Sequence, residues 1–94
     1  MKREWKVEIG RVVRSKAGRD EGRYFVVIAI EGDEFARVAD GGLRPIEKPK
    51  RTRLKHLFVT EETISGLQSR LAAGAAVENH ELRKWLSAYG QREE

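Results

Sequence analysis

The sequence predicts a mainly-β domain, with a small antiparallel barrel over residues 1–59 and a helical extension packed on it over residues 60–94. Two observations lead to this prediction. Short runs rich in valine and isoleucine alternate with glycine-containing turns, which is typical of small antiparallel barrels. After them, apolar residues recur at the spacing of helices. The length of 94 residues is that of one small domain.

The expected strands are short and rich in β-branched and aromatic residues. They cover residues 8–14, 23–30, 35–40, 43–46 and 54–59. Pro45 marks the fourth as an edge strand, because proline has no N–H to donate to a neighbouring strand. A polar link over residues 47–53 leads from the fourth strand to the fifth.

The strand at 23–30 is apolar on both faces, whereas a sheet with one wet face alternates apolar with polar residues. Successive side chains point to opposite faces, and the two sets are Tyr24, Val26, Ile28 and Ile30, and Phe25, Val27 and Ala29. One set fills the barrel and the other must be covered from outside. The sequence leaves open which set does which.

The last third of the chain supplies this cover as two helices. We expect Thr60 to cap the first helix and Gly74 to end it, and Asn79 to cap the second, which Gly90 ends. The apolar stripes contain Ile64, Leu67 and Leu71 in the first helix and Leu82, Trp85, Leu86 and Tyr89 in the second. Trp85 is interpreted as a packing residue rather than a ligand-stacking one.

The charge is unevenly distributed. Residues 1–60 hold 15 Lys and Arg against 9 Asp and Glu, whereas residues 61–94 hold 4 against 6, giving the net charge of +4. A basic excess confined to one part of a chain is typical of polyanion binding. A solvated surface has the same composition, so charge alone leaves both interpretations open.

The residue types argue against an enzyme. The chain has no cysteine, which excludes disulfides and thiolate metal sites. Two isolated histidines, His56 and His80, do not make a metal site. The carboxylates are scattered among basic residues and are expected to form surface ion pairs. We therefore expect no catalytic residue, no metal and no cofactor.

The first ten residues include several charged side chains and no apolar stretch, so we expect no signal peptide, and we expect a cytoplasmic location. No apolar run approaches the roughly 20 residues that span a membrane.

We expect Trp5 to anchor the edge of the barrel.

The turn between the first two strands carries more charge than a turn needs. Gly18 and Gly22 let another backbone approach closely, and basic side chains surround them. Bare backbone amides with Arg and Lys suit a phosphate chain. Asp20 and Glu21 oppose phosphate there, unless they pair with Arg19 or Arg23 and orient them.

The stretch IGRVVRSKAGRDEGRYFVVIAI, residues 9–30, resembles the KOW motif, a strand, a glycine-containing loop and a second strand. "GRVV", Gly22 before a basic residue, "FVVIAI", "VADG" and "LKHLFVT" follow in an order that resembles the fourteen-e family of large-subunit ribosomal proteins and the short bacterial KOW-domain RNA-binding proteins. The resemblance covers about residues 8–60. It implies an SH3-like barrel with a helical tail.

The resemblance also implies that the first loop and the adjacent strand ends face RNA, through Arg14, Ser15, Lys16, Arg19 and Arg23. The chain departs from the ribosomal pattern over residues 44–55, where six basic residues accompany one acid. We interpret this segment as a second phosphate-binding strip, against the alternative of a solvated loop. Its basic residues are Arg44, Lys48, Lys50, Arg51, Arg53 and Lys55.

The expected function is binding of structured RNA, ribosomal RNA above all, through backbone phosphates, in a ribosome-associated or ribosomal-protein-like monomer. Duplex RNA hides its base edges in a deep, narrow groove, so shape and phosphate contacts dominate. The alternative is a protein-interaction module of the translation or transcription machinery, whose partner binds the C-terminal helices.

Overall fold

The computed structural model describes residues 6–90, so Trp5 and the anchoring role expected of it lie outside the described residues. The strands are β1 (Arg11–Ser15), β2 (Tyr24–Glu31), β3 (Phe35–Ala39), β4 (Lys50–Arg53) and β5 (Leu57–Thr63). Two helices follow, α1 (Leu67–Ala72) and α2 (Asn79–Gly90). Two 3-10 turns, η1 (Gly18–Asp20) and η2 (Leu54–His56), precede β2 and β5.

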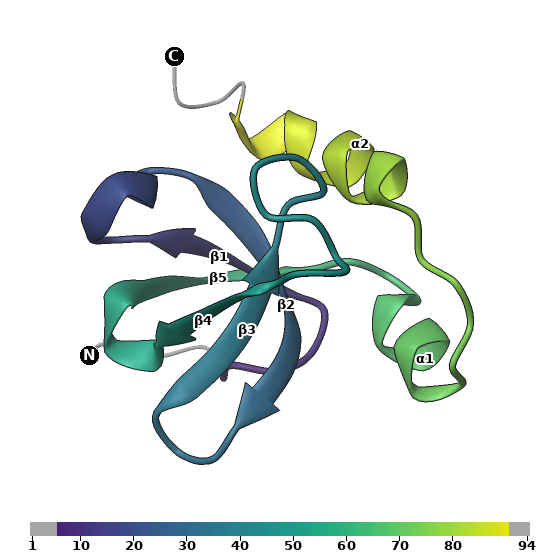
Figure 1. The fold of residues 1–94 in the computed structure, drawn as a ribbon, viewed down its shortest axis with the longest axis horizontal. Helices are drawn as coiled ribbons and strands as arrows, with labels where there is room; N and C mark the ends of the chain where they lie inside the picture. The colour runs from purple at the N-terminus through teal and green to yellow at the C-terminus, as the bar shows by residue number, and fades with distance from the viewer. Residues whose placement is uncertain (1–5, 91–94) are drawn as a thin grey trace.

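The strands form one antiparallel sheet in the order β4-β3-β2-β1-β5, with β2 at its centre. The two helices lie to one side of the sheet (Figure 1). The predicted fold class is confirmed at this level: the protein is a small, mainly-β domain with a five-stranded antiparallel sheet and two C-terminal helices. No helix within residues 6–90 is long and apolar enough to cross a lipid bilayer.

The strand predicted at 43–46 is wrong, because this segment is a loop that closes on itself. The carboxylate of Asp40 accepts the N–H groups of Gly42 and Arg44 at 3.0 and 2.8 Å, and the Arg44 carbonyl accepts two N–H groups in return. The fourth strand is instead β4, in the segment predicted to be a link, and it pairs with β3 from Val38 opposite Lys50 onwards. The first strand also begins later than expected, at Arg11, after a turn at Gly10.

The helix predicted to start at Thr60 is wrong as well. Thr60 lies within β5, and its hydroxyl donates a hydrogen bond of 2.6 Å to the Val12 carbonyl of β1. The chain becomes helical only at α1, after Gly66, which has a positive φ of 82°. Residues that favour the start of a helix can also stand at the end of an edge strand. Here residues 60–63 extend β5, which pairs with β1, instead of starting a helix.

The second helix begins where predicted, but Asn79 is not its cap. The Leu82 N–H donates to the Glu78 carbonyl, and the Glu81 carboxylate accepts the Glu78 N–H at 3.0 Å, which is one half of a capping box. The Asn79 side chain points elsewhere. It accepts the Ile46 N–H at 2.7 Å and donates to the Glu47 carboxylate, so it fastens α2 to the loop after β3.

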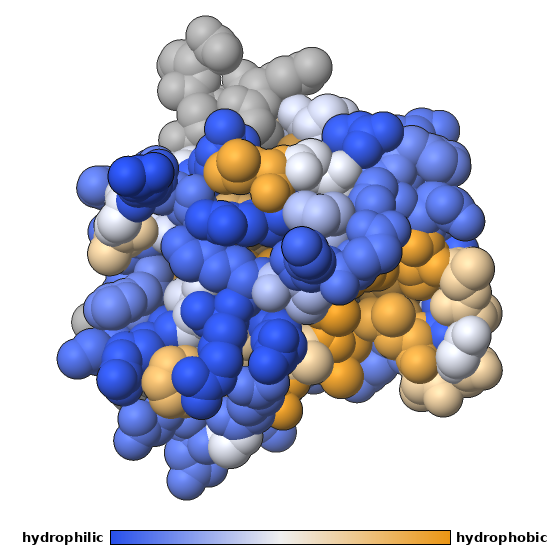
Figure 2. Space-filling view, in the orientation of Figure 1, coloured by the Kyte–Doolittle hydropathy of each residue, from blue (hydrophilic) through white to orange (hydrophobic). Residues whose placement is uncertain are grey.

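The double burial expected of the central strand is confirmed from Tyr24 to Ile28, but it is wrong for Ile30, which is 43% exposed and belongs to neither core. The structure also assigns the two faces of the strand. One core contains Phe25 and Val27 with buried residues of β1, β3 and β5. The other contains Val26, with Tyr24 and Ile28 packed against it. The second core is completed by residues of the two helices and of the segments before them. Ile64, predicted on the first helical stripe, lies before α1. The buried residues are Ile64, Leu67, Val77, Leu82 and Leu86, with Leu71, Trp85 and Tyr89 at the margin of the core. Figure 2 shows that apolar surface gathers towards α1, whereas the strands present mainly hydrophilic side chains.

Gly41 sets how closely the loop after β3 approaches α2. Its φ is +81°, and a Cβ added there would stand 2.2 Å from the Asn79 carbonyl oxygen and 3.0 Å from the Leu82 Cβ. Only a glycine satisfies both the conformation and the contact. At Gly42, the nearest atoms to such a Cβ are 3.9 Å away.

We predict that Leu67→Ala lowers the free energy of unfolding by about 2 to 5 kcal/mol, because Leu67 is fully buried in the core beneath the helices. Urea unfolding measures this loss. The exposed neighbour gives a control, Gln68→Ala, expected to change stability by about 0.5 kcal/mol or less. Equal stability of the two variants would show that α1 does not pack on the sheet.

We predict that Gly41→Ala costs at least about 2 kcal/mol, since it adds backbone strain to a collision with the α2 backbone. Gly42→Ala is the matched control and should be close to wild type. Thermal unfolding of the pair tests the close approach, and indistinguishable melting temperatures would refute it.

Candidate nucleic-acid interface

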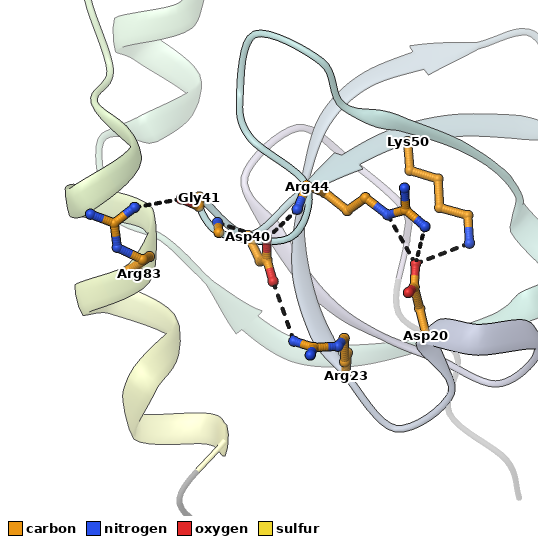
Figure 3. A network of polar contacts seen from close by, with 8 residues as sticks. Asp20, Arg23, Asp40, Gly41, Arg44, Lys50 and Arg83 are labelled. Carbon is orange, nitrogen blue, oxygen red and sulfur yellow. Dashed lines mark hydrogen bonds and ion pairs between the residues drawn. The ribbon is translucent and has the colours of Figure 1, made fainter.

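A buried carboxylate joins the two basic segments that the sequence singles out. Asp20 lies in η1, and its side chain is only 2% exposed. Its Oδ2 accepts hydrogen bonds from Arg44 Nε and Nη2 at 3.1 and 3.0 Å and from Lys50 Nζ at 3.0 Å (Figure 3). The considered pairing of Asp20 with Arg19 or Arg23 is wrong. The partners of the Asp20 carboxylate are instead Arg44 and Lys50, which lie 24 and 30 residues further along the chain.

The electrostatics of this cluster leave it positive. Burial raises the pKa of the Asp20 carboxyl, but the hydrogen bonds and charges of Lys50 and Arg44 lower it by more, so it lies below its ordinary value of 3.8. Asp20 is therefore ionised at neutral pH. One negative charge faces two positive ones, whose side chains remain about one-third exposed.

A second carboxylate extends the network towards α2. Besides its two backbone bonds, Asp40 forms a long ion pair of 3.8 Å with Arg23 of the first loop. On the other side of the same loop, Arg83 of α2 donates a hydrogen bond of 2.6 Å to the Gly41 carbonyl. Figure 3 shows these contacts linking α2, the loop after β3, the first loop and β4. The network holds the first loop in place relative to both helix and sheet.

The first loop and β4 together line a basic hollow of about 350 Å³, which we call the cationic hollow. None of the described residues that line it carries a carboxylate. Its lining comprises Ser15, Ala17, Gly18, Phe35, Lys50, Arg51, Thr52, Arg53 and His56. Three cations, a histidine and the loop backbone around Gly18 thus share one surface depression. Such a set matches the needs of a phosphate.

The arginines of β4 are oriented by partners that keep their charge at the surface. The Arg51 and Arg53 guanidinium groups lie over the Phe35 ring, 3.7 and 4.9 Å from its centroid. Arg51 Nε also donates to Glu31 at 2.7 Å, and Glu31 is paired with Arg37 besides. The bonds from Arg37 and Arg51 lower the pKa of Glu31. About half of each β4 arginine side chain remains exposed.

Four of the predicted cations are exposed and form no ion pair with any residue in the described range 6–90. They are Lys16, Arg19, Lys48 and Lys55. Lys16 is placed beside η2, because its N–H donates to the His56 carbonyl at 2.8 Å. These side chains can meet an anion without breaking an internal bond.

The remaining predicted residues are Arg14, Ser15, Arg23 and Arg44, and of these only Ser15 lines the cationic hollow. Arg14 lies on β1, on the opposite face of that strand from Ser15. Ser15 is buried, and its hydroxyl donates to the Ala17 carbonyl at 3.0 Å, so it shapes the loop. Arg23 lies in a separate groove of about 480 Å³ beside α2, with Arg83 and Asp40. Arg44 supports the site through Asp20 and does not line the cationic hollow.

Two aromatic residues near these cations were not among the predicted site residues. Phe35 forms the surface on which the β4 arginines lie. Phe58 is 54% exposed on β5, directly opposite Arg14 of β1. The alternation of strand residues could have shown this, because Leu57 and Val59 point into the core and Phe58 must then point out.

Comparison with known proteins adds no assignment: no protein-family model matches the chain, and no curated protein matches it significantly. Over the described residues, His, Asp and Glu side chains form no group of three that could hold a metal ion.

We predict that Asp20→Asn lowers the unfolding free energy at pH 7 by about 1.5 to 3 kcal/mol, the range for a hydrogen bond to a charged group. Because the pKa of Asp20 is lowered in the folded state, its contribution is complete above 3.8 and is lost as the pH falls through the lowered value. Urea unfolding at several pH values should show the difference from wild type shrinking in acid. Asp33→Asn removes an exposed carboxylate and serves as control; a similar loss there would refute the assignment.

Proposed function

We propose that this protein binds RNA through its sugar–phosphate backbone, using the cationic hollow and the exposed cations beside it. The observation that carries the proposal is the convergence of two separate basic segments, residues 14–23 and 44–55, around one carboxylate-free depression. The three cations of the hollow, Lys50, Arg51 and Arg53, come from β4, and the first loop, which Asp20 joins to Arg44 and Lys50, contributes its backbone around Gly18. Phosphate contacts of this kind position an RNA without reading its sequence.

The buried Asp20 supports this function despite its negative charge. It holds Arg44 and Lys50 in fixed positions while one positive charge remains in excess. Cations that are already ordered lose less side-chain entropy when a phosphate arrives. Backbone hydrogen bonds between Ser15 and Arg23 and between Gly22 and Ser15 close the first loop, whose side chains Lys16 and Arg19 are both exposed.

The proposal includes the finer fold and setting that the sequence suggests. The curved antiparallel sheet with a glycine-containing first loop is compatible with an SH3-like barrel of the KOW type. We propose structured RNA, ribosomal RNA above all, as the ligand of a monomeric, cytoplasmic, ribosome-associated protein without catalytic activity. A-form duplexes expose phosphates and 2′-hydroxyl groups rather than base edges, which suits a surface of cations.

The alternative, a protein-interaction module acting through the C-terminal helices, has less support. The apolar stripe that would serve such a partner is used inside the molecule, since Leu67, Leu82 and Leu86 are buried against the sheet. The two functions differ in their response to salt. RNA binding by charge weakens steeply as salt rises, whereas docking on an apolar surface does not.

We predict that Lys16→Ala with Arg19→Ala weakens binding of a structured RNA and flattens its salt dependence, by a slope of roughly 0.7 to 0.9 per lost phosphate contact. The fold should be retained, because both side chains are exposed and unpaired within residues 6–90. Fluorescence anisotropy with a labelled RNA hairpin at several salt concentrations measures both effects.

The control for this prediction is Lys84→Ala, which removes an exposed cation of α2 that lines neither the cationic hollow nor its margins. It should leave the slope unchanged. If the double variant kept the affinity and the salt slope of the wild type, the first loop would not be the RNA site.

A further inference from the structure

An exposed aromatic side chain lies on β5, outside the cationic hollow. Phe58 is 54% exposed, more than any other large apolar side chain in the described residues. It stands directly opposite Arg14, which in turn stands opposite Tyr24 of β2. The three side chains therefore share one face of the sheet, in a row across three strands. Tyr24 is partly covered by Tyr89 of α2, with ring centroids 5.8 Å apart, whereas the Phe58 end of the row is open.

The surroundings of Phe58 are charged. A shallow depression of about 270 Å³ is lined by Arg14, Ser15, Lys16, Glu21 and Phe58, and we call it the Phe58 platform. The lining thus combines the Phe58 ring with two cations, Arg14 and Lys16, and one carboxylate, Glu21. An apolar partner would have to desolvate these charges, which opposes a purely hydrophobic contact.

A nucleotide with an unpaired base has the matching chemistry. Its base has a flat π-face that stacks on an aromatic ring, and its phosphates carry the charge that Arg14 and Lys16 attract. Glu21 repels phosphate, so the backbone must pass on the side of the two cations. The base then lies over the Phe58 ring.

The Phe58 platform adjoins the cationic hollow. Ser15 lines both depressions, and the Lys16 N–H donates to the carbonyl of His56, which lines the hollow. One RNA chain can therefore follow the first loop from one to the other.

We propose that the Phe58 platform stacks an unpaired RNA base next to the phosphates that the cationic hollow binds. This inference rests on the proposed function and makes it more specific. The preferred ligand is RNA with a single-stranded nucleotide adjoining a structured region, rather than a continuous duplex. Arg14 and Lys16 bind the phosphates of that nucleotide, and Phe58 binds its base.

The test compares two RNAs, a hairpin carrying a short single-stranded extension and the same hairpin without it. Phe58→Leu keeps an apolar side chain but removes the π-face, and Phe58→Tyr keeps the ring. Ile30→Ala is the control, since Ile30 is 43% exposed on β2 and lines neither depression. Thermal unfolding of each variant verifies that the fold is retained.

We expect Phe58→Leu to weaken binding of the extended hairpin on the order of tenfold or more, the usual loss on removing a stacking partner. Its binding of the blunt hairpin should stay within about twofold of the wild type, and Phe58→Tyr and Ile30→Ala should match the wild type on both RNAs. An equal effect of Phe58→Leu on the two hairpins, or no effect, would overturn the platform while leaving the proposed function intact. A wild-type protein that binds neither hairpin would overturn both.

Discussion

The central strand β2 must be covered on both faces, and most of the architecture follows from that requirement. Val26 and Val27 are neighbours in the chain, yet they are buried in different cores on opposite sides of the sheet. Buried residues of β1, β2, β3 and β5 form one core, and the second is completed by residues of the helices and the segments before them. The helices cannot be an optional appendage, because without them Val12, Val26 and Ala39 would face water. The loop after β3 packs against α2, which covers this face of the sheet. Gly41 allows the backbone of the loop to approach the backbone of α2 closely.

The site that we propose for phosphate contains a buried carboxylate, and this arrangement has a physical explanation. Asp20 is nearly inaccessible to water, and a carboxylate in that position is tolerated only when it is fully paired. Its partners are thereby drawn from separate segments to a single point. The surplus of positive charge remains at the surface while the carboxylate stays inside. The ion cluster of Asp20, Arg44 and Lys50 that stabilises the first loop therefore also makes that part of the surface positively charged.

Local patterns in the sequence were sufficient for the elements whose burial is periodic. β2, β3 and α2 could be predicted because their apolar residues repeat at the spacing of a strand or a helix. The stripe predicted for the first helix is found only in part, because Ile64 lies before α1. β4 could not, since KRTR has no apolar alternation and becomes a strand only through pairing with β3. Thr60 suits a strand and a helix cap equally, and the outcome depends on β1. The cations of the site were recognisable from composition, but the choice of Arg44 and Lys50 as partners of Asp20 is made by the tertiary fold.

The short strand β4 stands at one end of the strand order, so its outer row of backbone donors and acceptors is not paired within the sheet of the described residues. Unpaired edges invite the strands of other molecules, and proteins commonly guard them with short length and with lysine or arginine side chains. β4 has both safeguards, being four residues long with three cations. Like charges on two copies repel each other when such edges meet. The charge proposed to attract RNA therefore also protects the protein from aggregating through this edge, and a neutral β4 would lose both properties at once.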